Sequence, residues 1–242
     1  MFLLDTPVSL AYDLVTGLSD LLRPVAGGLA TAAAITVFTA AVRLLLVPLA
    51  VAAARGERVR SRLLPKIQAL QSKHARNPQR LRRETAALYE AEGATPLAGC
   101  LPMFAQMPIF MVMYRLFVSA SVAGHQNLLL AHTLLGVPLG QNWVGLVGGG
   151  LFAPPSLVFL GLFALLAAVA LWTSRRAAKA GAAAGTGTGA EAAMGAVARI
   201  MPFGTVVVAA FVPLAAGLYL LTSGLWTAVE RAVLYRRIVA AA

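Results

Sequence analysis

A single apolar run, residues 29–54, most strongly constrains how this chain can fold. It reads LATAAAITVFTAAVRLLLVPLAVAAA and exceeds the about 20 apolar residues that cross a bilayer as a helix. Arg43 is its one charged residue, and an arginine at membrane depth costs at least about 2.5–3.5 kcal/mol on insertion scales. Thr36, Thr39 and Arg43 follow one another at i, i+3 and i+7, so a helix presents them on one face. The pattern predicts a membrane bundle with a polar cavity that Arg43 faces.

The composition extends this interpretation to the entire chain. Of 242 residues, 59% are hydrophobic and only 12% are charged, and the mean hydropathy is +0.78. A soluble protein with this composition would lack the polar side chains to cover its surface. Several apolar runs alternate with short charged segments, which is typical of an all-α polytopic membrane protein.

The distribution of positive charge indicates a membrane surface before a nucleic acid, although the net charge is +11. Ten of the twenty Lys and Arg residues lie between Arg55 and Arg83, and none lies between residues 116 and 173. Basic residues concentrate in the cytoplasmic loops of membrane proteins. We therefore expect a plasma-membrane protein with its N-terminus outside and its C-terminus in the cytoplasm, and we expect no DNA partner.

The apolar runs and their flanking charges predict five transmembrane helices. Both flanks of the run from Ile200 to Val229 are basic, which requires an even number of crossings, and Pro213 supplies the reversal. The expected spans are 29–54, 96–119, 156–174, 200–212 and 214–231. The other expected segments are an amphipathic outer-surface helix in 1–28, a cytoplasmic helical hairpin at 55–95, an outer connection at 120–155, a flexible cytoplasmic loop at 175–199 and a cytoplasmic tail at 232–242.

The hairpin is predicted by helix signals on both sides of a turn. Leu63, Ile67 and Leu70 form one apolar stripe, and Asn77-Pro78 is a favourable N-cap followed by proline at the first helical position. Gly93 is suited to end the second helix. The candidate contact residues on the hairpin are basic: Lys66, Lys73, Arg76, Arg80, Arg82 and Arg83.

The sequence contains no pattern typical of a catalytic or metal site. Cys100 is the only cysteine, the three histidines are scattered, and the chain has no phosphate-binding glycine loop and no nucleophile elbow. We expect no cofactor, no metal and no enzymatic activity. The absence of a mid-span carboxylate also disfavours a proton-coupled pump.

Arg43 is the leading candidate functional residue, and two interpretations of it stay open. It either braces the bundle by bonding to backbone carbonyls, or it is a cavity charge that meets polar or negative groups. Gln106, in the second span, is a candidate for the same cavity or an interhelical hydrogen bond. Tyr219, in the last span, is a candidate for the same cavity, and ordinary packing or a role as an interface anchor stays open.

Three segments resemble the YidC family of membrane protein insertases. They are AAVRLLLVPL around Arg43, the stretch from Leu63 to Phe117 with Asn77-Pro78 and QMPIF, and IMPFGTVVVAAFVPLAAGLYLLTSGLW. The resemblance implies five core spans, a cytoplasmic hairpin, and a groove with one arginine that is open to cytoplasm and lipid. It implies insertion of small nascent membrane proteins without nucleotide hydrolysis, alone or beside the Sec translocon, with the ribosome as a possible partner.

Two departures from the family pattern and two rival functions qualify this resemblance. Family members often carry a Gln in the third span, which is absent here, and a Trp where this chain has Leu220. Both changes predict a less polar groove. The rivals are an anion-conducting transporter or channel, whose inverted repeats are not evident, and a membrane assembly scaffold that uses the same groove without inserting proteins.

Overall fold

The computed structural model describes residues 5–93, 101–122, 124–146, 153–183, 195–197 and 199–234. This part of the chain is mainly α-helical and divides into two compact units, which are described separately. The first unit comprises Met1–Arg43 and Ile109–Val229, and the second comprises Leu44–Pro108 and Glu230–Ala242.

Apolar helices of membrane-crossing length are present. By length and composition, Asp5–Leu45 and Pro154–Lys179 are each sufficient to cross a bilayer. Shorter apolar helices occupy Val47–Gly56, Met107–Val118 and Gly195–Phe211. The predicted class, an all-α chain with candidate membrane helices, is therefore confirmed, whereas the count of five spans stays a prediction.

The N-terminal helix packs into the core of the first unit. The segment consists of α1 (Asp5–Ala26), η2 (Gly27–Leu29) and α2 (Ala30–Leu45). α1 buries Val8, Ala11 and Val15, and its place at the outer membrane surface stays a prediction. Pro24 lies inside α1, and the chain turns at Gly27, whose φ of +51° suits a residue without Cβ.

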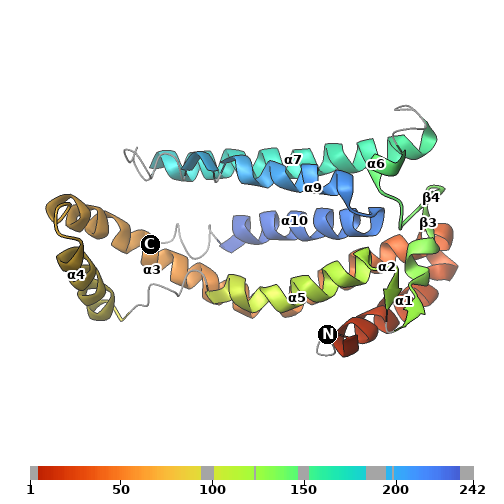
Figure 1. The fold of residues 1–242 in the computed structure, drawn as a ribbon, viewed down its shortest axis with the longest axis horizontal. Coiled ribbons are helices and arrows are strands. Elements are labelled where there is room, and N and C mark those ends of the chain that lie inside the picture. Colours follow the sequence, from red (N-terminus) through yellow and green to blue (C-terminus); the bar gives the residue numbers. More distant parts are fainter. Residues whose placement is uncertain are drawn as a thin grey trace. The chain divides into compact units, whose positions relative to one another are not determined.

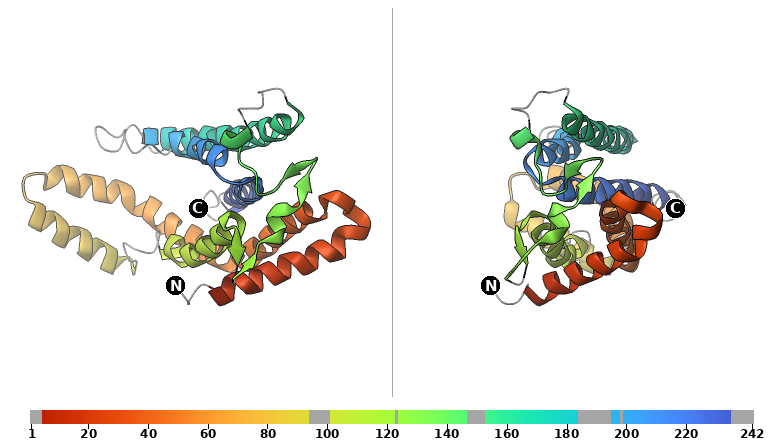
Figure 2. Two further views of the ribbon diagram at one scale, coloured as in Figure 1. Left: turned by 45° about the vertical axis from the view of Figure 1, so that its right-hand side comes forward. Right: turned by 90° about the vertical axis from the view of Figure 1, so that its right-hand side faces the viewer.

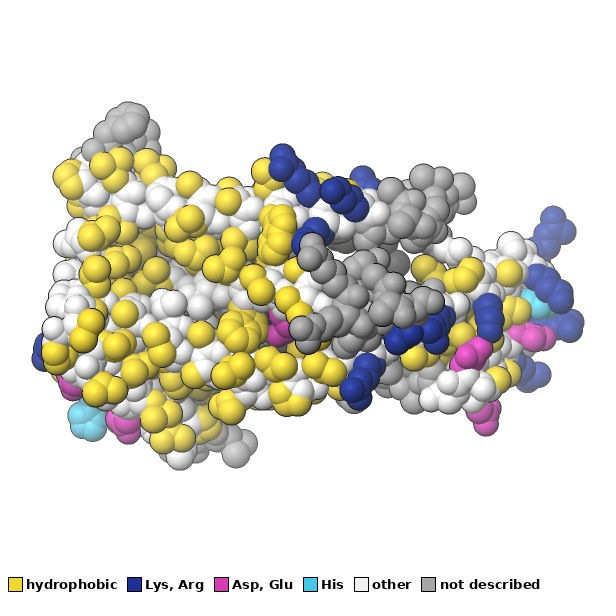
Figure 3. All heavy atoms as spheres, turned by 180° about the vertical axis from the view of Figure 1, so that it is seen from behind, with side chains coloured by type: hydrophobic (Ala, Val, Ile, Leu, Met, Phe, Trp, Pro, Cys, Tyr) yellow, Lys and Arg dark blue, Asp and Glu magenta, His cyan; other side chains and the backbone are white. Residues whose placement is uncertain are grey.

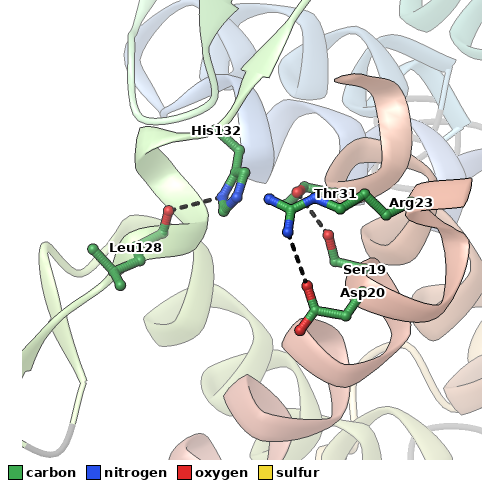
Figure 4. A network of polar contacts seen from close by, with 6 residues as sticks. All are labelled: Ser19, Asp20, Arg23, Thr31, Leu128 and His132. Atoms are coloured by element: carbon green, nitrogen blue, oxygen red, sulfur yellow. Dashed lines mark hydrogen bonds and ion pairs between the residues drawn. The ribbon is translucent and has the colours of Figure 1, made fainter. Parts of the chain in front are cut away.

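Two links hold α1 in place within this unit. The hydroxyls of Ser19 on α1 and Thr31 on α2 share a buried hydrogen bond of 2.8 Å (Figure 4). The Asp5 carboxylate lies 2.9 Å from the guanidinium of Arg115 on α5 (Leu101–Val118). α1 is thus fixed to two other helices near its two ends.

The segment expected to form an outer connection, residues 120–155, has more structure than the sequence analysis predicted. It contains the hairpin of β1 (Ser121–Val122) and β2 (His125–Gln126), η3 (Leu128–Ala131), the hairpin of β3 (Thr133–Leu134) and β4 (Val137–Pro138), and α6 (Trp143–Leu146). The β3–β4 turn places Leu135 and Gly136 at φ +52° and +82°, and positive φ at both residues is typical of a two-residue hairpin. Val122, Leu129, Val137 and Leu139 of this connection are buried.

The third apolar segment is longer than predicted. α7 runs Pro154–Ala183, so the first residues of the loop expected at 175–199 are helical. Its last part, RRAAKAGAA, is rich in alanine, the best helix former, which explains the extension.

The predicted break at Pro213 is present. η5 (Met201–Phe203) and α9 (Gly204–Phe211) precede it, and α10 (Leu214–Leu234) follows. Val212 is extended, as expected of a residue before proline. α9 lies along α7 in Figures 1 and 2, and α10 packs on α7 where Gly217 meets Leu162.

The second unit contains the predicted helical hairpin. α3 (Val47–Lys73) and α4 (Pro78–Ala91) lie side by side in Figures 1 and 2. The Asn77 side chain accepts a 3.0 Å hydrogen bond from the backbone of Arg80, and Gly93 has a φ of +59°, so both helix signals are confirmed. The membrane boundary expected between residues 54 and 55 stays a prediction, and α3 runs through it without a break. The break falls at Leu46 because Pro48, which has no backbone N–H, is suited to the first turn of a new helix.

The surface of the described chain separates apolar from basic side chains. Hydrophobic side chains cover much of the helical surface in Figure 3, and Lys and Arg side chains gather over the α3–α4 hairpin. Exposed apolar residues include Leu10 and Leu21 on α1, Leu165 on α7 and Val229 on α10. Such a surface is suited to lipid rather than water.

Candidate functional site

Arg43 is bonded to the last long helix of the first unit. It lies in the last turn of α2, and its Nε donates a 3.0 Å hydrogen bond to the hydroxyl of Ser223 on α10. A terminal guanidinium nitrogen donates to the same hydroxyl. Ser223 is buried, whereas Arg43 is half-buried. The arrangement places a guanidinium between two apolar helices and leaves part of it exposed.

Tyr219 lies one helical turn before Ser223 and completes this cluster. Its phenol is a hydrogen-bond partner of Ser223, and its side chain is largely buried. The ring centroid is 6.0 Å from that of Phe117 and 6.4 Å from that of Phe110, both on α5. Aromatic packing on one side and Ser223 on the other therefore fix the position of Tyr219.

The two predicted threonines bond within their own helix. The Thr36 hydroxyl donates to the Ala32 carbonyl at 3.0 Å, and the Thr39 hydroxyl donates to the Ile35 carbonyl at 2.7 Å. Thr39 is buried, whereas Thr36 is exposed. Neither hydroxyl proton is directed at Arg43, so these residues contribute at most oxygen lone pairs to the cluster.

One predicted site residue cannot be placed, and one site residue was missed. The Gln106 side chain lies outside the part of the structure that is described. Ser223 was not identified from the sequence, although it is a polar residue inside an uncharged run and lies four residues after Tyr219. The i, i+4 spacing puts both side chains on one helix face and could have indicated Ser223.

All six basic candidate residues of the hairpin are exposed, and two of them are paired with carboxylates. The Lys66 ammonium lies 2.6 Å from the Glu92 carboxylate, and this bond and charge hold the pKa of Glu92 below its ordinary 4.5. Arg80 pairs with Glu84 at 3.6 Å, one turn along α4. Lys66 therefore closes the base of the hairpin, and four further exposed cations lie nearer its tip: Lys73, Arg76, Arg82 and Arg83.

Metal-ligating side chains do not cluster in the described ranges. There, no group of three or more His, Cys, Asp or Glu residues is placed to hold a metal ion. The polar cluster at Arg43 instead combines a guanidinium with the hydroxyl of Ser223 and the phenol of Tyr219.

Comparison with known proteins assigns the family. The family model described as "60Kd inner membrane protein" matches residues 22–241. A protein of Acidiphilium cryptum named "Membrane protein insertase YidC" is 32% identical over 72% of this chain and 28% of its own length. A protein of the same name from Mycolicibacterium paratuberculosis is 30% identical over 72% of this chain and 58% of its own.

A shorter match falls in part of the chain. The "Membrane protein insertase YidC" of Oceanobacillus iheyensis is 44% identical over 34% of this chain and 34% of its own length. In each of these three comparisons the chain spans less than two thirds of the relative. The family model nevertheless covers almost all of the present sequence, and the protein therefore belongs to the 60Kd inner membrane protein family, the YidC family of bacterial membrane proteins.

Proposed function

We propose that this protein inserts small nascent membrane proteins into the bilayer through a polar groove that is open to cytoplasm and lipid, without hydrolysing a nucleotide. The observation that carries the proposal is Arg43, a half-buried guanidinium held by Ser223 among apolar helices. The name insertase, which the relatives bear, supports the same activity.

The physical basis of the mechanism is the cost of moving a polar segment across hydrocarbon. A hydrated groove that ends partway through the bilayer shortens the apolar path of such a segment. Arg43 would keep water in the groove and attract carboxylates of the substrate. The apolar substrate helix would then leave sideways into lipid, where its backbone hydrogen bonds are satisfied internally.

The proposed topology has five spans, an outer N-terminus and a cytoplasmic C-terminus. Two aromatic groups near the ends of α7 support this orientation. Trp143 packs on Phe159 and Phe163, whose centroids lie 6.0 and 5.4 Å away. Toward the other end, the Arg176 guanidinium lies 4.5 Å from the Trp172 ring centroid. Tryptophan is enriched at both membrane interfaces, and arginine marks the cytoplasmic one.

Cysteine labelling tests the orientation. Gln141→Cys in the outer connection should react with an impermeant thiol reagent added to intact cells, and Lys179→Cys should not, with Cys100 replaced by Ser in both. Reaction of the Lys179 variant alone would overturn the topology.

The proposed partners are nascent membrane proteins and, through the exposed basic residues of the hairpin, the Sec translocon or the ribosome. Arg76, Arg82 and Arg83 are exposed cations that can meet acidic or phosphate groups. Lys66, Lys73 and Arg80 belong to the same proposed set, since all three are exposed, although Lys66 pairs with Glu92 and Arg80 with Glu84.

Three variants distinguish the groove charge from a structural brace. Arg43→Ala removes both the charge and the bond, Arg43→Lys keeps the charge, and Ser223→Ala removes the bond and leaves the arginine. Insertion into proteoliposomes is measured with two substrates that differ only in acidic or neutral outer segments, and the melting temperature of each variant is measured in parallel.

The groove mechanism makes a selective expectation. Arg43→Ala should lower insertion of the acidic substrate about tenfold, equivalent to about 1.4 kcal/mol, and should affect the neutral substrate much less. Arg43→Lys and Ser223→Ala should retain most of the activity because they keep the positive charge. Equal losses for both substrates in all three variants, in proportion to lowered melting temperatures, would contradict the mechanism and leave Arg43 as a brace.

A further inference from the structure

The first backbone amides of α10 are buried, and they donate hydrogen bonds to a segment that is distant in the sequence. Leu214 and Ala215 are fully buried, so water cannot bond to their amides. The preceding Val212 and Pro213 have apolar side chains and cannot act as an N-cap. Instead, the Leu214 amide donates to the carbonyl of Gln141 at 2.8 Å, and the Ala215 amide donates to the carbonyl of Leu139 at 2.9 Å.

These carbonyls belong to residues 139–142, which we name the strap. The strap is fixed on its other side as well, because the Leu139 amide donates to the His132 carbonyl and the Gly140 amide donates to the Leu130 carbonyl, both at 2.8 Å. The Leu139 side chain is fully buried. The strap therefore connects the β3–β4 hairpin and η3 to the first turn of α10.

Gly140 is required by the close approach of the strap to η3. A Cβ at this position would lie 3.0 Å from the Leu130 Cβ and 3.2 Å from the Leu130 carbonyl oxygen. Both are tighter than ordinary van der Waals contact, and neither belongs to the flexible end of a side chain. A larger residue at 140 would push the strap away from η3 and pull its carbonyls from the amides of α10.

We propose that the strap is a positioning element for α10, and that Gly140 is its key positioning residue. α10 carries Tyr219 and Ser223 within its next turns, about 8 and 14 Å along the axis from Leu214 at 1.5 Å per residue. Because a helix is rigid over this length, the two strap bonds set the axial position and the rotation of α10. They therefore set where Ser223 meets Arg43. The consequence for insertion rests on the proposed function, whereas the positioning itself does not.

Hydrogen exchange tests the strap bonds directly. In the full chain in lipid nanodiscs, Gly140→Val should raise the exchange rate of the Leu214 and Ala215 amides at least about tenfold, and Gly140→Ala should raise it less. Gly161→Ala is the matched control, because a Cβ on that glycine of α7 meets no atom within 4 Å. Unchanged exchange in Gly140→Val would overturn the proposal.

A double-mutant cycle tests whether the strap acts on Ser223 rather than on stability alone. Ser223→Ala should lower the melting temperature of the wild-type chain clearly, and the milder Gly140→Ala variant should reduce that effect to less than half. Distant sites without a shared element are additive, so a Ser223→Ala effect that is the same in both backgrounds would overturn the positioning role.

Insertion assays then separate this proposal from the proposed function. If both hold, the double-mutant cycle shows coupling between Gly140 and Ser223, and Arg43→Ala lowers insertion of the acidic substrate. If the cycle shows coupling but Arg43→Ala inserts normally, the strap still positions α10 and the groove mechanism fails. If Arg43→Ala is defective and the cycle is additive, the proposed function stands and the strap proposal fails.

Discussion

Replacing Ser19 by alanine should destabilise the first unit, because Ser19 and Thr31 are each other's hydrogen-bond partner inside the core. Their oxygens are 2.8 Å apart, and the residues are only 7% and 2% exposed. Figure 4 shows the pair between α1 and α2. A buried hydroxyl left unpaired costs about 1–3 kcal/mol. Since about 1 kcal/mol shifts the melting temperature of a domain of this size by about 2–4 °C, Ser19→Ala should lower it by about 2–12 °C.

The same reasoning predicts that the double variant is less harmful than the sum of its parts. Ser19→Ala and Thr31→Val together remove both polar groups, so neither is left unsatisfied, and the pair should show a coupling of about 1 kcal/mol. Thermal unfolding in detergent, followed by circular dichroism, measures all variants. Ser9→Ala is the control, because its exposed hydroxyl bonds only to Thr6 of the same helix. Additive losses, or no loss in Ser19→Ala, would refute the buried-pair interpretation.

Three further predictions concern the hairpin and the contact of α10 with α7. In Lys66→Met the pKa of Glu92 should return toward 4.5 in an NMR titration, and an unchanged pKa would contradict the pairing. Because the pKa of Glu92 is lower in the folded than in the unfolded chain, the stabilisation from this pair is present above pH 4.5. It is lost as the pH falls through the folded pKa. Gly217→Val should lower the melting temperature by the equivalent of about 1–3 kcal/mol, because a Cβ at residue 217 would lie 2.6 Å from the Cδ2 of Leu162 and that side chain is buried, which restricts its movement; Gly161→Val, in open space, should cost less. Asn77→Ala should cost the hairpin about 1 kcal/mol through loss of its N-cap, with Gln79→Ala neutral in the same helicity measurement; equal effects would exclude capping as the cause.

Features that depend on neighbouring residues were predictable from the sequence. Asn77-Pro78 and Gly93 predicted the ends of α4, and Pro213 predicted the break before α10. The apolar runs predicted candidate membrane helices, because the length and hydropathy of a segment are properties of that segment alone. The isolated charge of Arg43 marked it as the residue to explain.

Features that depend on distant residues were decided by the tertiary structure. Ser223 lies 180 positions from Arg43, and no local rule joins them. The same holds for the contact of Asp5 with Arg115 and for the strap carbonyls that bond to the first amides of α10. The sequence alone determined which segments are apolar helices and where several of them end. Which polar groups meet was decided only by packing, because a buried donor bonds to whichever acceptor the folded chain brings within reach.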